Sequence, residues 1–168
     1  INDDETTIFF TCHNIALADK LRQRIPRFFD FMMVNKQIKW NERLWMSRAW
    51  GSKNNPNTGL YSYLCNYYNL PFCRYSPGVD YQVIFSNVLE AINAIPPKKF
   101  KPCLDYILVD ESQDFPEVFF EVCKKVVRQK VYMAGDVFQD IFDSVKKKKW
   151  GVDIVLNRCY RTDPRTLM

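Results

Sequence analysis

Short apolar runs alternate with amphipathic stretches along this chain, and the alternation predicts an α/β fold. Thr6–Cys12 is β-branched and aromatic, which is typical of a buried strand. Tyr106–Val109 is a continuous apolar run, as expected for a strand covered on both faces of a parallel sheet. Lys130–Ala134 predicts a second buried strand and Asp153–Leu156 a third candidate. Strands alternating with helices indicate βαβ units and a mainly parallel sheet.

Helical periodicity fills the intervals between these strands. Asn14, Asp80 and Asp114 each precede such a pattern and are residues that cap helices. Pro26 is expected to kink or restart the first helix. The apolar positions, spaced by three or four residues, are Leu17, Leu21 and Ile25 in the first pattern, Ile84, Val88, Ile92 and Ile95 in the second, and Val118, Phe119, Val122 and Val126 in the third.

The middle of the chain has weaker patterns. Gln37–Trp45 alternates well enough to predict a short strand, because Ile38, Trp40 and Leu44 share one parity. Gly51–Gly59 is expected to be a loop and Leu60–Asn69 a helix. We expect the tryptophans of this region to lie in the core; they are Trp40, Trp45 and Trp50.

Composition narrows the class of protein. The 168 residues suffice for one compact domain, and 47% hydrophobic with 26% charged residues is typical of a soluble globular chain. No apolar run is long enough for a membrane span. The net charge of +5 fits nucleic-acid binding without requiring it. Six cysteines without a CxxC pair, and the single His13, argue against zinc and disulfides, so we expect a cytoplasmic protein with reduced thiols.

The clearest candidate chemistry is the acidic pair Asp110 and Glu111, directly after the strand Tyr106–Val109. Ligands of open parallel sheets bind outside the carboxyl ends of the strands. One carboxylate there can hold Mg²⁺ through water while its neighbour polarises an attacking water. The alternative is a pair of ordinary surface acids at a strand end.

Four segments resemble motifs of UvrD/Rep-type superfamily 1 DNA helicases, and they occur in that family's order. ILVDESQDF (107–115) resembles the Walker B motif, and VYMAGDVFQDIF (131–142) resembles motif III. LNRCYRT (156–162) resembles motif IV, and IFFTCHNIALADKL (8–21) resembles motif Ia. The Walker B and motif III pair is the specific part of the resemblance.

The resemblance implies a fold of the RecA-like P-loop NTPase type, a mainly parallel sheet flanked by helices. Residues 1–36 and 105–168 would form part of the first motor domain. Residues 37–104 would hold the motif Ib region and a helical inserted subdomain. The implied activity is ATP-dependent DNA helicase activity, in which Mg-ATP hydrolysis drives movement along single-stranded DNA.

The same resemblance implies roles at the nucleotide. Asp110 would be the Mg²⁺ carboxylate, through water, and Glu111 the base beside the metal that activates the hydrolytic water. Gln139 would sense the γ-phosphate of ATP, and Arg161 would meet that phosphate as an arginine finger. Gln139 and Arg161 are ordinary surface polar residues in the alternative reading.

Other positions would couple the nucleotide to DNA. Gln113 and Asp136 would belong to that relay. The residues that would face single-stranded DNA are Thr11, His13, Asn14 and Phe142, the last by packing near or stacking on a base. For these four the alternatives are a strand residue, a surface residue, a helix cap and a core residue, respectively.

The sequence departs from the family in one important way. A phosphate-binding loop needs G-x-x-x-x-G-K-[S/T], and none of the five glycines lies in such a motif. In the family that loop precedes motif Ia and a second motor domain follows motif IV. We therefore expect the chain to be a piece of a longer helicase, with the remainder of that chain as its partner and no measurable ATPase alone. Motif IV also has Cys159 where the family tends to have asparagine.

Two other functions remain open at this point. A metal-dependent nuclease would use Asp110, Glu111 and Asp136 as Mg²⁺ ligands. A non-catalytic, helicase-like domain would only bind nucleic acid or act as an adaptor. Magnesium-dependent DNA cleavage without nucleotide would favour the nuclease, whereas an upstream sequence without a phosphate loop would favour the adaptor.

Overall fold

The computed structural model describes residues 5–34 and 37–135, and these form an α/β fold around a parallel sheet. Its strands are β1 (Ile8–Cys12), β2 (Leu44–Arg48), β3 (Leu104–Val109) and β4 (Val127–Met133). They lie in the order β2-β1-β3-β4, and every neighbouring pair is parallel. The carboxyl ends of all four strands therefore meet at one edge of the sheet.

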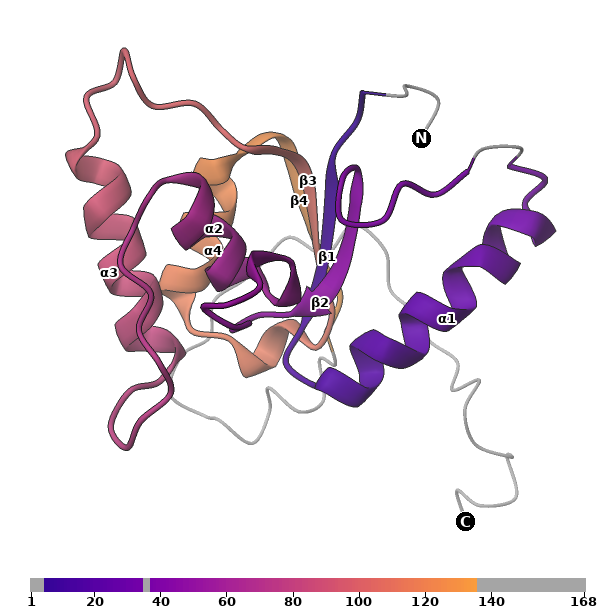
Figure 1. The fold of residues 1–168 in the computed structure, drawn as a ribbon, viewed down its shortest axis with the longest axis horizontal. Coiled ribbons are helices and arrows are strands. Elements are labelled where there is room, and N and C mark those ends of the chain that lie inside the picture. Colours follow the sequence, from indigo (N-terminus) through magenta and orange to yellow (C-terminus); the bar gives the residue numbers. More distant parts are fainter. Residues whose placement is uncertain (1–4, 35–36, 136–168) are drawn as a thin grey trace. The chain divides into compact units, whose positions relative to one another are not determined.

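Helices flank both faces of this sheet (Figure 1). Helix α1 (Ile15–Phe31) lies on one face, where it packs mainly against β1 and β2. The other face is covered by α2 (Leu60–Tyr67), α3 (Tyr81–Ala94) and α4 (Glu117–Val126). Short 3₁₀ turns are formed by Pro56–Thr58 and Ser112–Asp114. The predicted α/β class and parallel sheet are confirmed. No helix in the described part of the chain is long and apolar enough to cross a membrane.

The packed core lies on the α2–α4 side and is rich in aromatic rings. Phe9 of β1, Phe85 of α3 and Phe119 of α4 are fully buried. The Phe119 ring stacks on Phe115 at 4.2 Å and meets Phe85 edge-on at 4.8 Å between centroids. The α1 face of the sheet is less well packed, because Ala18 is the one buried residue of that helix. The packing that holds the strands in place therefore comes mainly from the α2–α4 face of the sheet.

Two of the three predicted helix caps are confirmed. The Asn14 side chain accepts a hydrogen bond from the Ala16 N–H at 2.8 Å, and the Asp80 side chain accepts one from the Val83 N–H at 2.9 Å. Pro26 lies inside an unbroken α1, so the predicted restart is wrong. The Asp114 cap is also wrong, because Asp114 belongs to the 3₁₀ turn and α4 begins after Pro116 without a side-chain cap.

The strand predictions were less accurate in detail. The predicted strand Gln37–Trp45 is wrong over most of its length, because β2 starts only at Leu44. Trp45 and Met46 are both buried in β2, so both faces of that strand are covered and its true pattern is continuous rather than alternating. The predicted double-sided burial of β3 and β4 is also wrong. Leu108 is only half-buried and Tyr132 is 50% exposed, because α1 packs over β1 and β2 instead.

Side chains of residues 37–104 pack in the same hydrophobic core as side chains of β1, β3 and β4. These residues supply β2, which pairs with β1, and helices α2 and α3, whose buried side chains join the cluster around Phe9. The assignment of 37–104 to an inserted subdomain stays a prediction. The strand predicted at Asp153–Leu156 lies outside the described residues.

Candidate functional site

The acid turn, residues 110–114, follows β3 and is tied by backbone hydrogen bonds to the strands on both sides. The Asp110 N–H donates to the Thr11 carbonyl of β1 at 3.0 Å. The Ser112 N–H donates to the Ala134 carbonyl just beyond β4 at 2.9 Å. The Ala134 N–H in turn donates to the Val109 carbonyl of β3 at 2.8 Å. Three neighbouring strand ends thus fix the backbone that carries the two carboxylates.

Glu111 has a left-handed backbone conformation, with φ 50° and ψ 52°. For a residue with a side chain this conformation costs on the order of 1–3 kcal/mol, and such residues gather at functional sites. The turn is held by local hydrogen bonds: the Glu111 N–H donates to Asp110 Oδ1 at 3.0 Å, and the Asp114 N–H donates to the Glu111 carbonyl at 3.0 Å. These hydrogen bonds maintain the strained conformation of Glu111.

The Glu111 carboxylate is oriented by a neutral donor. Gln113 Nε2 donates to Glu111 Oε2 at 2.7 Å, and both side chains are half-buried. An amide fixes the position of a carboxylate without cancelling its charge. The sequence predicted Gln113 as part of a relay, and the described structure brings it into contact with the acidic pair.

Asp110 lies close to the end of β1. Burial raises the pKa of the Cys12 thiol, and the negative charges of Asp110 and, less strongly, Glu111 act in the same direction. Both carboxylates therefore lie near the point where β1 ends and α1 begins.

Gly135 packs against the acid turn from the β4 side. A side-chain carbon at this position would overlap Ser112 Oγ and would lie 2.8 Å from the Gln113 amide oxygen. Glycine allows the chain that leaves β4 to approach the turn this closely. The contact links the end of β4 to the amide that orients Glu111.

The donor set suits Mg²⁺, which prefers oxygen ligands and usually takes one or two carboxylates together with water and phosphate oxygens. Among residues 5–34 and 37–135, no three His, Cys, Asp or Glu side chains form a group that would hold a metal alone. A magnesium ion at the acid turn would therefore need ligands beyond the protein carboxylates described.

The predicted nucleic-acid residues near β1 differ in accessibility. Thr11 is fully buried, and its hydroxyl has no hydrogen-bond partner in the described part of the chain. His13 is exposed, and its ring lies 5.3 Å from that of Tyr81. Asn14 is exposed but its side-chain oxygen caps α1. Of these three, only His13 lines the groove described below. Contacts of all three with DNA stay predictions.

The predicted residues Asp136, Gln139, Phe142 and Arg161 lie outside the described residues. The structure therefore brings together Asp110, Glu111 and Gln113. The convergence of Gln139 and Arg161 on the γ-phosphate, the relay role of Asp136 and the contact of Phe142 with DNA stay predictions.

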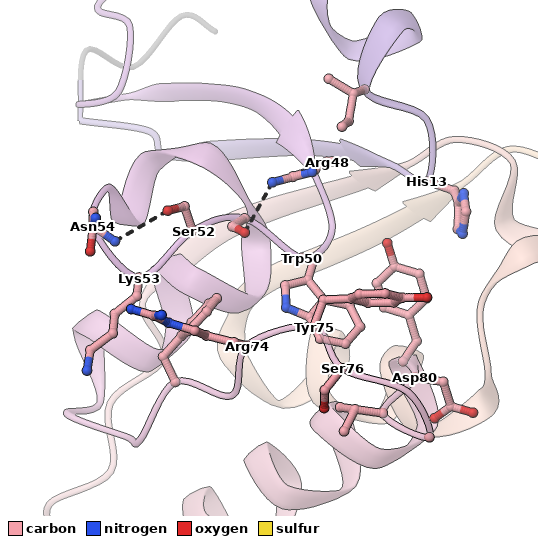
Figure 2. A pocket seen from close by; sticks show the side chains of 16 residues that line it. His13, Arg48, Trp50, Ser52, Lys53, Asn54, Arg74, Tyr75, Ser76 and Asp80 are labelled. Carbon is pink, nitrogen blue, oxygen red and sulfur yellow. Dashed lines mark hydrogen bonds between the residues drawn. The ribbon is translucent and has the colours of Figure 1, made fainter.

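A groove that the sequence did not predict opens beside the carboxyl ends of β1 and β2 (Figure 2). Its volume is about 930 Å³, and its wall includes His13 after β1, Arg48 at the end of β2, Trp50, and the loop residues Arg74 and Tyr75. The prediction that Trp45 lies in the core is confirmed. For Trp50 the prediction holds in part, since this residue is half-buried and packs against the core cluster but also lines the groove. Trp40 is half-buried and lies outside that core. The sequence feature that could have indicated this groove was the adjacent pair Arg74 and Tyr75 in a loop.

Comparisons with known proteins leave the interpretation to this geometry. No family model, no curated protein and no solved structure matches the chain.

Proposed function

We propose that this chain is part of the motor of an ATP-dependent DNA helicase or translocase, of the UvrD/Rep superfamily 1 type, that moves on single-stranded DNA. The observation that carries the proposal is the acid turn. Two adjacent acidic residues, Asp110 and Glu111, follow a central strand at the edge of a parallel sheet where ligands bind. Glu111 has a strained backbone conformation, and a hydrogen bond orients its side chain. The resemblance of the motifs in order supports the same assignment.

In this proposal three residues of the acid turn, Asp110, Glu111 and Gln113, have separate roles. Asp110 would hold Mg²⁺ through water, and the ion would supply positive charge beside the phosphates of ATP. Glu111 takes the proton of the attacking water, and Gln113 keeps the Glu111 carboxylate in place for that step. Gln139 and Arg161 would contact the γ-phosphate, and Asp136 would pass the change in the nucleotide to the DNA side.

The phosphate-binding loop must come from a segment other than this one, since the printed sequence contains no such motif. We propose that a longer chain supplies it together with a second motor domain. In this proposal an additional strand would pair with the outer edge of β4, with which no strand of the described residues pairs.

The test is Glu111→Gln in the longer protein. Removing a general base lowers hydrolysis by roughly 10²–10⁴-fold, whereas the amide keeps the size of the side chain and leaves Mg-ATP binding near its original strength. Steady-state ATPase and equilibrium nucleotide binding are measured together.

Glu121→Gln is the matched control, because Glu121 is an exposed glutamate of α4 outside the turn, and its variant should keep full turnover. Retained turnover in Glu111→Gln would remove Glu111 from the role of base. Magnesium-dependent DNA cleavage without nucleotide would favour a nuclease instead. We also expect no measurable ATPase from the 168-residue chain alone, and robust hydrolysis by it would contradict the need for an external phosphate loop.

A further inference from the structure

Residues 74–78 (RYSPG) lie in an exposed loop between α2 and α3, and most of them line the groove beside β1 and β2. Every residue of this stretch is exposed, Tyr75 by 79%. A side-chain carbon placed on Gly78 would meet no atom of the described residues within 4 Å, so the tip of the loop projects into open space. Exposed loop tips of this kind are the segments that other enzymes reach most easily. The loop is therefore accessible to a modifying enzyme.

Ser76 begins a tight turn within this loop. The Val79 N–H donates to the Ser76 carbonyl at 3.0 Å, and Gly78, at the third position of the turn, has φ 82°. Proline at the second position followed by a residue of positive φ is the signature of a type II turn. The turn therefore holds Pro77 directly after the serine in one backbone conformation, and both residues are exposed.

The Ser76 hydroxyl has no hydrogen-bond partner among the residues that the structure describes. Ser47 and Ser62 differ from it, because both are buried and their hydroxyls donate to backbone carbonyls at 2.9 Å. Ser76 is also followed by proline, and the printed sequence holds no other Ser-Pro or Thr-Pro pair. An exposed acceptor hydroxyl and a following proline thus coincide at this one residue.

Positive charge lies in the wall of the groove that Ser76 also lines (Figure 2). The cationic side chains of this wall are Arg48, Lys53 and Arg74. Asp80 is the one carboxylate among the described lining residues, and it is engaged as the cap of α3. A phosphoserine carries about −1.5 to −2 charges at pH 7, and beside arginines it forms charge-assisted hydrogen bonds. The wall therefore suits a phosphate attached to Ser76.

We propose that Ser76 is a phosphorylation site for a proline-directed protein kinase, and that the attached phosphate binds to Arg74 and the other cations of the groove wall. In the transfer the Ser76 hydroxyl oxygen bonds to the γ-phosphorus of ATP and the bond to the β-phosphate oxygen breaks. ADP leaves, and the hydroxyl proton passes to a base of the kinase. The phosphate offsets most of the positive charge of the wall, so the modification makes an electropositive groove nearly neutral. Neither the site nor this change of charge depends on the function proposed for the acid turn.

The experiment incubates the 168-residue chain with ATP and a proline-directed Ser/Thr kinase of the mitogen-activated class, and locates phosphate by tandem mass spectrometry. We expect a single phosphate, at Ser76. Both Ser76→Ala and Pro77→Ala should abolish the transfer, the second although the acceptor hydroxyl is kept. Ser52→Ala is the matched control, because it removes another hydroxyl of the groove wall that is followed by lysine, and it should leave the transfer unchanged. Circular dichroism confirms that each variant is folded.

A second measurement follows the phosphate once it is attached. Phosphorus NMR titration reports the pKa of the phosphoserine, which a nearby guanidinium lowers. Arg74→Ala should raise this pKa by about 0.5, the size expected of an exposed ion pair. Arg24→Ala should leave it unchanged, because Arg24 is an exposed arginine of α1 outside the groove.

The two measurements test the two parts of the proposal separately. The absence of phosphate at Ser76, or transfer that persists in Pro77→Ala, would overturn the modification site. A phosphoserine pKa that is the same with and without Arg74 would overturn the binding of the phosphate to the groove wall.

Discussion

The two ends of strand β3 both carry acid, but the carboxylates are held in different ways. At the amino end, Asp105 Oδ1 accepts a hydrogen bond from Arg128 Nε at 2.6 Å, and Oδ2 accepts two from Thr7 at 2.8 Å each. At the carboxyl end, Glu111 is oriented by the neutral amide of Gln113 on a left-handed backbone.

On the proposed function, the amino end of β3 contributes to stability and its carboxyl end to chemistry. The Arg128 guanidinium, followed by Thr7, lowers the pKa of Asp105 to about 2, which fixes that carboxylate as a charged structural contact. At Glu111 the hydrogen-bond partner is a neutral amide, which does not cancel the charge of the carboxylate. We therefore expect changes at the amino end to act on folding and changes at the carboxyl end to act mainly on catalysis.

Gly135→Ala should have a strong effect on the carboxyl end of β3. The added methyl group would displace Ser112 and the Gln113 amide oxygen, and with it the partner of Glu111. Because small displacements of catalytic groups have large effects on rate, ATP turnover of the longer protein should fall about 10–100-fold. Because the overlapping atoms are side-chain ends at an exposed position, the free energy of unfolding should fall by no more than about 1 kcal/mol.

A second substitution checks the cause of that loss. Ser112→Ala removes the hydroxyl that the new methyl group would overlap, so the double variant should regain part of the lost stability. Stability that is strictly additive in the two variants, measured by urea denaturation, would show that the contact is not responsible.

The next effect concerns the amino end and its dependence on pH. Because the folded-state pKa of Asp105 is about 2, below its ordinary 3.8, this carboxylate stabilises the fold above pH 3.8, and the contribution is lost as the pH falls toward 2. Asp105→Asn should lower the free energy of unfolding at pH 7 by about 1–2 kcal/mol, allowing for the partly exposed arginine. The variant should also show a shallower loss of stability between these pH values. Identical pH profiles of unfolding for the variant and wild type would contradict the assignment.

The smallest effect tests the strain in the acid turn itself. Glu111→Gly and Glu111→Ala both remove the carboxylate, but only glycine adopts the left-handed conformation freely. The glycine variant should therefore be more stable than the alanine variant by about 1 kcal/mol, measured by denaturant titration. An alanine variant of equal or greater stability would indicate that the turn is unstrained.

The sequence predicted the elements whose signals are local. Asn14 and Asp80 cap their helices as predicted, because a side-chain oxygen next to free backbone N–H groups acts within one turn. The predicted Asp114 cap was wrong because the left-handed Glu111 first leads the chain into a 3₁₀ turn. The side-chain pattern of the sequence does not indicate such a backbone conformation.

Features that depend on packing between distant segments were not predictable in the same way. The acid pair was placed at the sheet edge by the general rule for parallel strands. The burial of Thr11 depends on the register of β1 and on the core beneath it, and neither is encoded near residue 11. The groove was missed because tryptophans and tyrosines that line a surface and those that fill a core look alike in sequence.

The role of the acid turn can be examined in a structure of the longer protein with Mg²⁺ and a non-hydrolysable ATP analogue. The account predicts Mg²⁺ linked through water to Asp110, and a water in line with the γ-phosphate within about 2.6–3.2 Å of the Glu111 carboxylate. A nucleotide bound away from the carboxyl end of β3, or an acid turn facing away from its phosphates, would contradict it.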